Sequence, residues 1–239
     1  MDEKERNALL EAYSKSVEAR MNIVLKHMQA GVKFVDVSSA YIDENVEIGA
    51  GTVIGPCVTL EGNTRIGRDC VIRQNTRITD SQISDGVEIE NSVIVESTIG
   101  EGTKVGPFAY MRPGSRVGAH CKVGDFVEIK NSTFGDGSKA AHLTYIGDSD
   151  VGCDVNLGCG VVFVNYDGTA KYRSTVSDGA FIGCNSNLVS PVNVGEGAYI
   201  AAGSTVTEDV EGDALYIARA RGTKKQGWVS AKGILKRKK

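Results

Sequence analysis

The sequence has few aromatic residues, no long apolar segment and no cysteine pair of the CxxC type. Phe, Trp and Tyr make up only 6% of the 239 residues, so a core must be built from small aliphatic side chains. No apolar run approaches the roughly 18 residues of a membrane-spanning helix, and we expect no membrane contact. The charged start, MDEKERN, lacks the apolar segment of a signal peptide. These absences favour a cytoplasmic protein.

The cysteines are scattered along the chain: Cys57, Cys70, Cys121, Cys153, Cys159 and Cys184. This distribution is typical of reduced thiols in the cytoplasm and favours neither a disulfide framework nor a zinc site. The formal net charge of −3 argues neither for nor against a nucleic-acid partner, and we expect none.

What the sequence does contain is an internal repeat with a period of about six residues. Aliphatic or other large apolar residues recur in steps of six or five, with breaks after Phe134 and Leu157: Ile42, Ile48, Ile54, Leu60, Ile66, Ile72, Ile78, Ile83, Ile89, Ile94, Ile99, Val105, Met111, Val117, Val123, Ile129, Phe134, Ile146, Val151, Leu157, Ile182, Leu188, Val194, Ile200 and Val206. A small residue stands two positions before most of them, as in Thr52 before Ile54, and Gly often follows.

This repeat predicts short strands that each turn two side chains inward. Side chains alternate along a strand, so residues two apart face the same way. A following Gly supplies a corner where positive φ is cheap. Three strands per coil predict a triangular prism of roughly 18 residues per coil, with about nine coils stacked about 4.8 Å apart. An antiparallel β protein is the alternative, but hairpins do not produce a fixed six-residue step over so long a segment.

The two ends of the chain differ from the repeat. Apolar residues at helical spacing between about 5 and 30 predict one amphipathic helix, whose apolar stripe indicates packing rather than binding, and Gly31 lies at the expected C-cap. We therefore expect a linker helix (1–35), a β-helix domain (36–218) and a basic tail (219–239). The root of the tail near Arg219 is either solvated or holds a phosphorylated ligand. We expect the final KRKK to be disordered.

The repeat has one long interruption, VNYDGTAKYRST at 164–175, which we interpret as a loop inserted at 164–178. It contains Asp167-Gly168, a turn signal. Loops that project from a rigid scaffold frequently carry function, and a neutral insertion is the alternative.

The phase of the repeat turns several polar side chains outward: Arg112, Glu128, Lys130, His142, Tyr145 and Asn156. Arg112 and Lys130 are 18 residues apart, so we expect them on neighbouring coils, where two adjacent cations favour a bound anion such as phosphate. An outward His142 near them is a candidate general base. A surface or interface histidine fits the spacing equally well.

Long motifs add to this interpretation: GPFAYMRPGS (106–115), GDFVEIKNS (124–132), GSKAAHLTYIGD (137–148), NLGCGVVFVNYDG (156–168), LVSPVNVGEGAYIAAGSTVTEDV (188–210) and QGWV (226–229). With these motifs the chain resembles, from about Tyr41 to Trp228, the C-terminal half of the bacterial bifunctional glucosamine-1-phosphate acetyltransferase / N-acetylglucosamine-1-phosphate uridylyltransferase family. The segment before it resembles the family's interdomain linker. The resemblance implies an all-β fold, a left-handed parallel β-helix of hexapeptide repeats, with the helix and a short tail at its ends.

The resemblance also implies a reaction: transfer of the acetyl group of acetyl-CoA, the co-substrate, to the 2-amino group of glucosamine 1-phosphate, on the way to UDP-N-acetylglucosamine and cell-wall precursors. No metal is expected for this step. A homotrimer with its sites between subunits is implied. The motifs carry over the general base (His142), the sugar-phosphate site (Arg112, Lys130, Tyr145, Asn156) and the acetyl-CoA contacts (Cys159, Asn165, Tyr166, Cys184, Ala202, Arg219). Lys171 is a further substrate candidate, and Glu128 is a candidate to orient His142.

The chain departs from the family in two respects. Cys159 and Cys184 stand where we expect Ala and Ser, which is tolerable if the contacts there are made by the backbone. Nothing resembles the Gly-rich nucleotide loop of the family's first half, LAAGxGTRM, so we expect neither uridylyl transfer nor its magnesium.

Three alternatives stay open: a hexapeptide acyltransferase with another acceptor, a non-catalytic trimeric scaffold, and a γ-class carbonic anhydrase, for which only His27, His120 and His142 exist.

Overall fold

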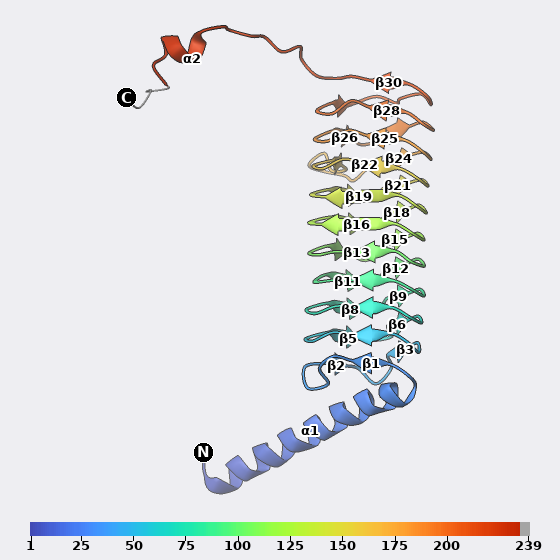
Figure 1. The fold of residues 1–239 in the computed structure, drawn as a ribbon, viewed down its shortest axis with the longest axis vertical. Helices are drawn as coiled ribbons and strands as arrows, with labels where there is room; N and C mark the ends of the chain where they lie inside the picture. Colours follow the sequence, from blue (N-terminus) through green and yellow to red (C-terminus); the bar gives the residue numbers. More distant parts are fainter. Residues whose placement is uncertain (235–239) are drawn as a thin grey trace.

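The chain folds into a long triangular prism with a helix at one end and an extended tail at the other (Figure 1). The structure is a computed structural model that describes residues 1–234. Helix α1 (Glu3–Gln29) leads into the first coil, and the tail carries one short helix, α2 (Trp228–Ala231). The terminal KRKK segment, expected to be disordered, lies outside the described residues.

The prism has three parallel β-sheets, of 11, 10 and 9 strands. Sheet A consists of β1 (Lys33–Phe34), β4 (Val53–Ile54), β7 (Val71–Ile72), β10 (Glu88–Ile89), β13 (Lys104–Val105), β16 (Lys122–Asp125), β19 (Lys139–His142), β22 (Asn156–Leu157), β25 (Phe181–Ile182), β28 (Tyr199–Ile200) and β30 (Leu215–Tyr216). Sheet B consists of β2 (Tyr41–Ile42), β5 (Thr59–Glu61), β8 (Arg77–Thr79), β11 (Val93–Val95), β14 (Tyr110–Met111), β17 (Glu128–Lys130), β20 (Tyr145–Gly147), β23 (Val162–Val164), β26 (Asn187–Val189) and β29 (Thr205–Val206). Sheet C consists of β3 (Glu47–Ile48), β6 (Arg65–Ile66), β9 (Gln82–Ile83), β12 (Thr98–Ile99), β15 (Arg116–Val117), β18 (Thr133–Phe134), β21 (Ser149–Val151), β24 (Ser174–Val176) and β27 (Asn193–Val194).

This arrangement confirms the triangular prism expected from the repeat and the left-handed parallel β-helix implied by the family resemblance. From β1 to β29, successive strands of the chain belong to successive sheets, and each strand pairs with the strand one coil away. Every apolar residue of the predicted series is buried, and together they form one continuous core along the prism. Burying each aliphatic side chain contributes about 1.5–3 kcal/mol, so the stack of coils is held together mainly by this column.

In many coils the inward residue that stands two positions before the aliphatic one is Ser or Thr. The hydroxyl groups of these residues are hydrogen-bonded although they are buried. The Thr52 hydroxyl donates to the carbonyl of Gly67 (2.8 Å) and accepts from the N–H of Cys70 (3.0 Å). Thr103 repeats this pattern higher in the prism, with a 2.7 Å bond to the carbonyl of Gly118. Among the described residues, no buried side-chain nitrogen or oxygen lacks a hydrogen-bond partner. Ser and Thr can therefore replace apolar residues inside without a desolvation penalty.

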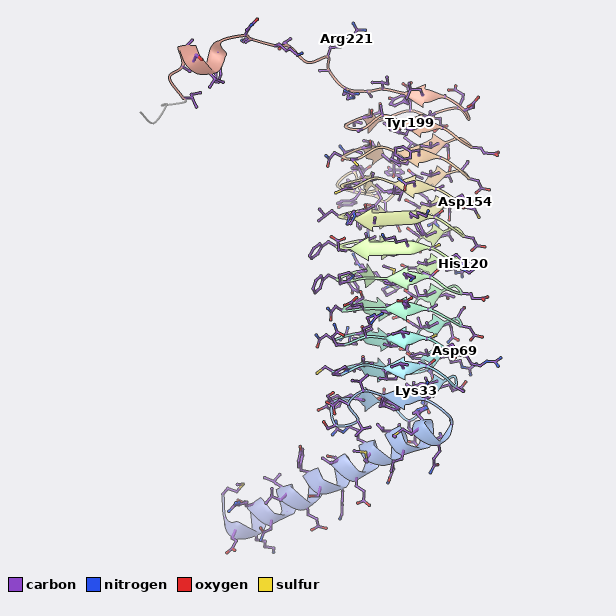
Figure 2. The ribbon with its side chains drawn as sticks, in the orientation of Figure 1. Lys33, Asp69, His120, Asp154, Tyr199 and Arg221 are labelled. Atoms are coloured by element: carbon purple, nitrogen blue, oxygen red, sulfur yellow. The ribbon has the colours of Figure 1, made fainter. Side chains whose placement is uncertain are left out.

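The corners between sheets have left-handed backbone, which is why Gly, Asn and Asp recur there. Asp69, His120 and Asp154, labelled in Figure 2, lie along the corner between sheets C and A with φ of 54°, 55° and 53°. Coils also approach closely: a Cβ built on Gly100 would lie 2.4 Å from the carbonyl carbon of Gly118. A larger residue at such a site would force two coils apart.

Helix α1 is well capped and touches the prism only near its C-terminal end. The Asp2 carboxylate accepts from the N–H of Glu5, while the Glu5 carboxylate accepts from the N–H of Asp2, a capping box. Arg20 donates to the carbonyl of Ser38 (2.8 Å) and lies 4.6 Å above the ring of Tyr41. These contacts fix the helix against the first coil, so the remainder of α1 projects away from the prism (Figure 1).

The inserted loop is shorter than predicted. Strand β23 ends at Val164 and β24 begins at Ser174, so only residues 165–173 leave the coil, rather than 164–178. Ser174 and Val176 are both buried and repeat the small-plus-aliphatic pair of the other coils. The loop thus leaves sheet B and returns to sheet C within a single corner.

We predict that Ile94→Ala, in the middle of the core column, destabilises the chain by about 2–5 kcal/mol, because it removes a fully buried side chain and leaves a cavity between tightly stacked coils. Urea unfolding at fixed protein concentration measures the loss. Val35→Ala, at a side chain that is 67% exposed, is the control and should change stability by less than about 0.5 kcal/mol. Equal effects of the two variants would contradict the core assignment.

Candidate functional site

Two of the candidate cations lie side by side on sheet B, as the spacing predicted. The register pairs Tyr110 with Glu128 and Met111 with Ile129, which sets Arg112 beside Lys130 on the next coil. Each cation has a carboxylate partner: Arg112 Nη1 lies 2.8 Å from Glu128 Oε1, and Lys130 Nζ lies 3.0 Å from Asp148 Oδ2. The two cations are therefore held in place before any anion binds.

Asp148 is the centre of the hydrogen bonds behind these cations. Its oxygens accept from Lys130, from Asn131 Nδ2 (2.6 Å) and from Asn165 Nδ2 (2.5 Å). Burial raises the pKa of Asp148, but the hydrogen bonds from Asn131, Lys130 and Asn165 outweigh it and lower the pKa overall. Asp148 therefore stays charged at neutral pH and orients both Lys130 and the start of the loop at Asn165.

The loop adds a third cation to this group. The interaction with Lys130 lowers the pKa of Lys171, and the charge of Arg112 lowers it further, so the Lys171 ammonium is near both cations. Lys171 makes no ion pair within residues 1–234. We call Arg112, Lys130 and Lys171 the cation cluster. With Glu128 and Asp148 as the anions beside it, the cluster keeps an excess of one positive charge, which suits a phosphate ligand.

Tyr145 lies over the same face of sheet B. Its ring occupies the space above Gly147, where an added Cβ would lie 2.4 Å from the phenolic oxygen. Gly147 is the register partner of Lys130, so the Tyr145 hydroxyl points toward the cation cluster. Asn165 Nδ2 lies 3.5 Å from that hydroxyl. The ring can lie flat on the sheet only because residue 147 has no side chain.

The structure corrects the expected partner of His142. Glu128 is bound to Arg112, and it is Asp125 whose carboxylate contacts His142 Nδ1. Strands β16 and β19 align Asp125 with His142, one coil apart and 17 residues distant in sequence. The contact orients the imidazole and leaves Nε2 free to accept a proton; the imidazole is 56% exposed. Sequence reasoning missed Asp125, although the 17-residue spacing was available as a signal.

The corner between sheets A and B, the A–B edge, lines up the candidate base with the proposed acetyl-CoA contacts. In sheet A the inward residues of four successive coils pair in register: Ala140, Leu157, Ile182 and Ile200. The residues two positions after each of these therefore form one column along the edge: His142, Cys159, Cys184 and Ala202. Arg219 extends this column, because its Cδ lies 3.7 Å from the Cβ position of Gly203. The prism thus offers one continuous strip of small side chains that begins at His142 and ends at a cation.

Other candidates lie apart from this group. Asn156 is on the outer face of sheet A, paired in register with Lys139, and so faces away from the cation cluster on sheet B. Tyr166 is exposed on the loop, and its hydroxyl donates to the carbonyl of Gly168 (2.6 Å). One chain therefore does not gather all the candidates around one point.

An apolar ridge runs along the A–B edge beside His142, made of Phe108, Phe126 and Leu143. All three are more than half exposed and have left-handed backbone, with φ of 59°, 56° and 49°. The two Phe rings stack with centroids 5.5 Å apart. Most other coils have Asn or Gly at this corner: Asn75, Asn91, Gly160, Asn185 and Gly203. A left-handed backbone costs a bulky residue about 1–2 kcal/mol, so this ridge needs a reason beyond folding.

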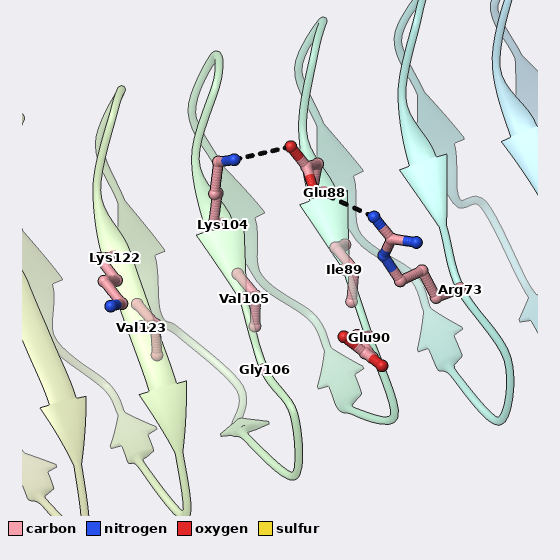
Figure 3. Close-up of a pocket in the computed structure, with 9 residues that line it drawn as sticks. All are labelled: Arg73, Glu88, Ile89, Glu90, Lys104, Val105, Gly106, Lys122 and Val123. Atoms are coloured by element: carbon pink, nitrogen blue, oxygen red, sulfur yellow. Dashed lines mark hydrogen bonds and ion pairs between the residues drawn. The ribbon is translucent and has the colours of Figure 1, made fainter.

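A groove on sheet A has a different character (Figure 3). Glu88 lies between two cations, 2.8 Å from Lys104 Nζ and 3.4 Å from Arg73 Nη2. Lys104 and Arg73 lower the pKa of Glu88. The charges compensate one another across three coils, and none of the candidate residues lies there. We therefore assign this groove to stabilisation of the surface.

The histidines do not converge within one chain. His27 is buried on α1, His120 lies on the corner between sheets C and A, and His142 lies on the A–B edge. Among residues 1–234, no three His, Cys, Asp or Glu side chains are grouped to bind a metal ion. No helix in this described part is both long enough and apolar enough to cross a bilayer.

Comparison with known families agrees with the fold. The family model described as bacterial transferase hexapeptide (six repeats) matches residues 96–131, and that of the GMPPB C-terminal domain matches residues 37–107. Among solved structures, the Francisella novicida UDP-N-acetylglucosamine acyltransferase is similar at 20% identity, with a TM-score of 0.46 over 76% of this chain and 66% of that one. Residues 96–131 thus carry the hexapeptide repeat of that family model, in the coils that hold Arg112 and Lys130.

Curated relatives with higher sequence identity assign the chain to a narrower family. The bifunctional protein GlmU of Clostridium botulinum (strain ATCC 19397 / Type A) is 51% identical over 97% of this chain, and that of Clostridioides difficile (strain 630) is 57% identical over 89%. The chain spans about half the length of these relatives, 50% and 46% respectively. The chain is a homologue of the C-terminal half of the bifunctional GlmU proteins.

The effect of Lys130 on the pKa of Lys171 can be tested by substitution. Lys130→Met should raise the pKa of Lys171, because it removes the adjacent charge that lowers this pKa while Asp148, which raises it, remains. A pH titration of the lysine side-chain signals by NMR measures the shift. Lys139→Met, which removes an exposed lysine from sheet A, is the control and should leave Lys171 unchanged. If Lys171 titrated identically in all three proteins, the cation cluster would not exist as described.

Proposed function

We propose that the chain transfers the acetyl group of acetyl-CoA to the 2-amino group of glucosamine 1-phosphate. The observation that supports this most is the position of His142. It lies at the start of the strip formed by Cys159, Cys184 and Ala202, and Tyr145 lies between it and the cation cluster. A thioester carried along the strip and a phosphate held by the cluster would both approach this imidazole.

The proposed mechanism is direct transfer. Arg112, Lys130 and Lys171 bind the phosphate, and Tyr145 bounds the sugar on the face of sheet B. His142 Nε2 accepts a proton from the amine as its nitrogen attacks the thioester carbonyl, while Asp125 holds the imidazole in the required orientation. CoA leaves as the thiolate and takes up a proton. General-base help contributes about 10²–10⁴-fold, and positioning of the two substrates contributes further.

A homotrimer completes this proposal. Asn156 and the cation cluster lie on different faces of one prism, so a second copy is needed to bring an Asn156 to the sugar. The apolar ridge runs along the edge next to His142 and provides an exposed apolar strip for such a contact. All six cysteines are free, which fits a reducing cytoplasm.

Activity is tested by CoA release from acetyl-CoA, measured by chromatography because exposed Cys57 and Cys184 would react with thiol reagents. We expect turnover with glucosamine 1-phosphate and little with glucosamine, which lacks the phosphate. His142→Ala should lower kcat about 10²–10⁴-fold. His120→Ala, at an exposed corner histidine, is the control. Equal turnover of both acceptors, or an unchanged kcat in His142→Ala, would contradict the proposal.

The role of the ridge is tested by Phe126→Asn, which installs the residue type that other coils have at this corner. The change removes the backbone strain of a bulky residue with positive φ, so the thermal midpoint of the isolated chain should stay the same or rise. It also removes apolar contact area between subunits, so sedimentation equilibrium should show trimers dissociating toward monomers. Cys57→Asn, at the same edge far from the ridge, is the control. An unchanged trimer would remove the ridge from the interface.

A further inference from the structure

The loop at residues 165–173 is attached to the prism at both of its ends, and both attachments are on one short segment. At its start, Asn165 Nδ2 donates to Asp148 Oδ2 (2.5 Å). At its end, Arg173 donates two hydrogen bonds to Asp150, from Nε to Oδ2 (2.5 Å) and from Nη2 to Oδ1 (2.6 Å). Asp148 and Asp150 flank the first residue of β21, at the corner that follows Tyr145 and Gly147.

Arg173 makes more contacts than an ordinary surface ion pair. Its Nη1 donates to the carbonyl of Asn131 (2.9 Å), and its Nη2 also lies 3.2 Å from the carbonyl of Ser149. Asp150 is held in turn by the hydroxyl of Thr133 (2.7 Å). The Asp150 carboxylate raises the pKa of Arg173, and Arg173 lowers that of Asp150. A bidentate ion pair with further hydrogen bonds to backbone carbonyls fixes the position of the Arg173 side chain, which a single exposed ion pair would not do.

We propose that Arg173 is a positioning residue that holds Lys171 in the cation cluster. Lys171 is two residues before Arg173 and bridges to Tyr166 across the loop, so the pair between Arg173 and Asp150 determines where the Lys171 ammonium lies. Arg173 itself is engaged with Asp150 and with two backbone carbonyls, and acts on the phosphate only through Lys171. The expected effect of Arg173 on substrate binding rests on the proposed function, whereas its effect on the position of Lys171 does not.

The test is Arg173→Gln, with Arg173→Lys as the conservative variant. Without the bidentate pair, Lys171 moves away from Lys130, so its pKa should rise toward that of an ordinary lysine in an NMR titration. The KM for glucosamine 1-phosphate should rise about three- to tenfold, with kcat within about twofold, since binding rather than chemistry is weakened. Arg173→Lys should bring the pKa of Lys171 and the KM only part of the way back to the wild-type values, because an ammonium cannot form the bidentate pair.

Asp150→Asn should reproduce the effects of Arg173→Gln, and the double variant should add little to either. Arg65→Gln, which removes a single exposed pair with Glu47 on sheet C, is the control and should change neither readout. An unchanged Lys171 titration in Arg173→Gln would overturn the inference, whether or not the chain transfers acetyl groups. A parallel fall of kcat with a lowered thermal midpoint would also overturn it, because Arg173 would then serve the fold alone.

If the wild-type chain shows no acetyl transfer while the Lys171 titration shifts as expected, the proposed function fails and the positioning role stands. The two failures are therefore distinguishable.

Discussion

The register between stacked coils is the constraint on which the rest of the structure depends. Each coil buries one small and one large inward side chain per strand, and a slip of one residue would turn every one of them to the opposite face. The core therefore fixes which outward residues become neighbours. Asp125 meets His142, and Arg112 meets Lys130, because Val123 must lie on Ala140 and Met111 on Ile129. Positions on the surface are thus set by burial inside.

This constraint also separates the parts of the candidate site. Residues two positions beyond the inward residues of sheet A form the strip along the A–B edge, from His142 to Ala202. Residues at the ends of sheet B strands, with the loop, form the cation cluster. Asn156 lies on the outer face of sheet A and so faces away from the cation cluster on sheet B. A rigid prism cannot bend to bring these two faces together, which is why the proposed site needs a second copy of the chain.

Much of the fold could be predicted from the sequence, because the repeat is a direct record of inward and outward positions. The residue that contacts His142, Asp125, could not be predicted in this way. The coil that carries His142 has Ala140 at the position where the other coils have a large apolar residue, so the apolar series has a gap there and does not indicate the 17-residue step from Asp125 to His142. The loop boundary was misplaced although Ser174 and Val176 repeat the inward pair. The contacts of Arg173 left no pattern, because they depend on where a non-repeating loop returns.

The proposed function requires the coil register to hold a phosphate on the cation cluster and a proton acceptor, His142, on the other side of Tyr145. The most direct measurement is a crystal structure of the chain with glucosamine 1-phosphate bound. The account predicts the phosphate in contact with Arg112, Lys130 and Lys171, and the amino group within hydrogen-bond reach of His142 Nε2. A phosphate bound elsewhere on the prism, or an amine directed away from His142, would contradict it.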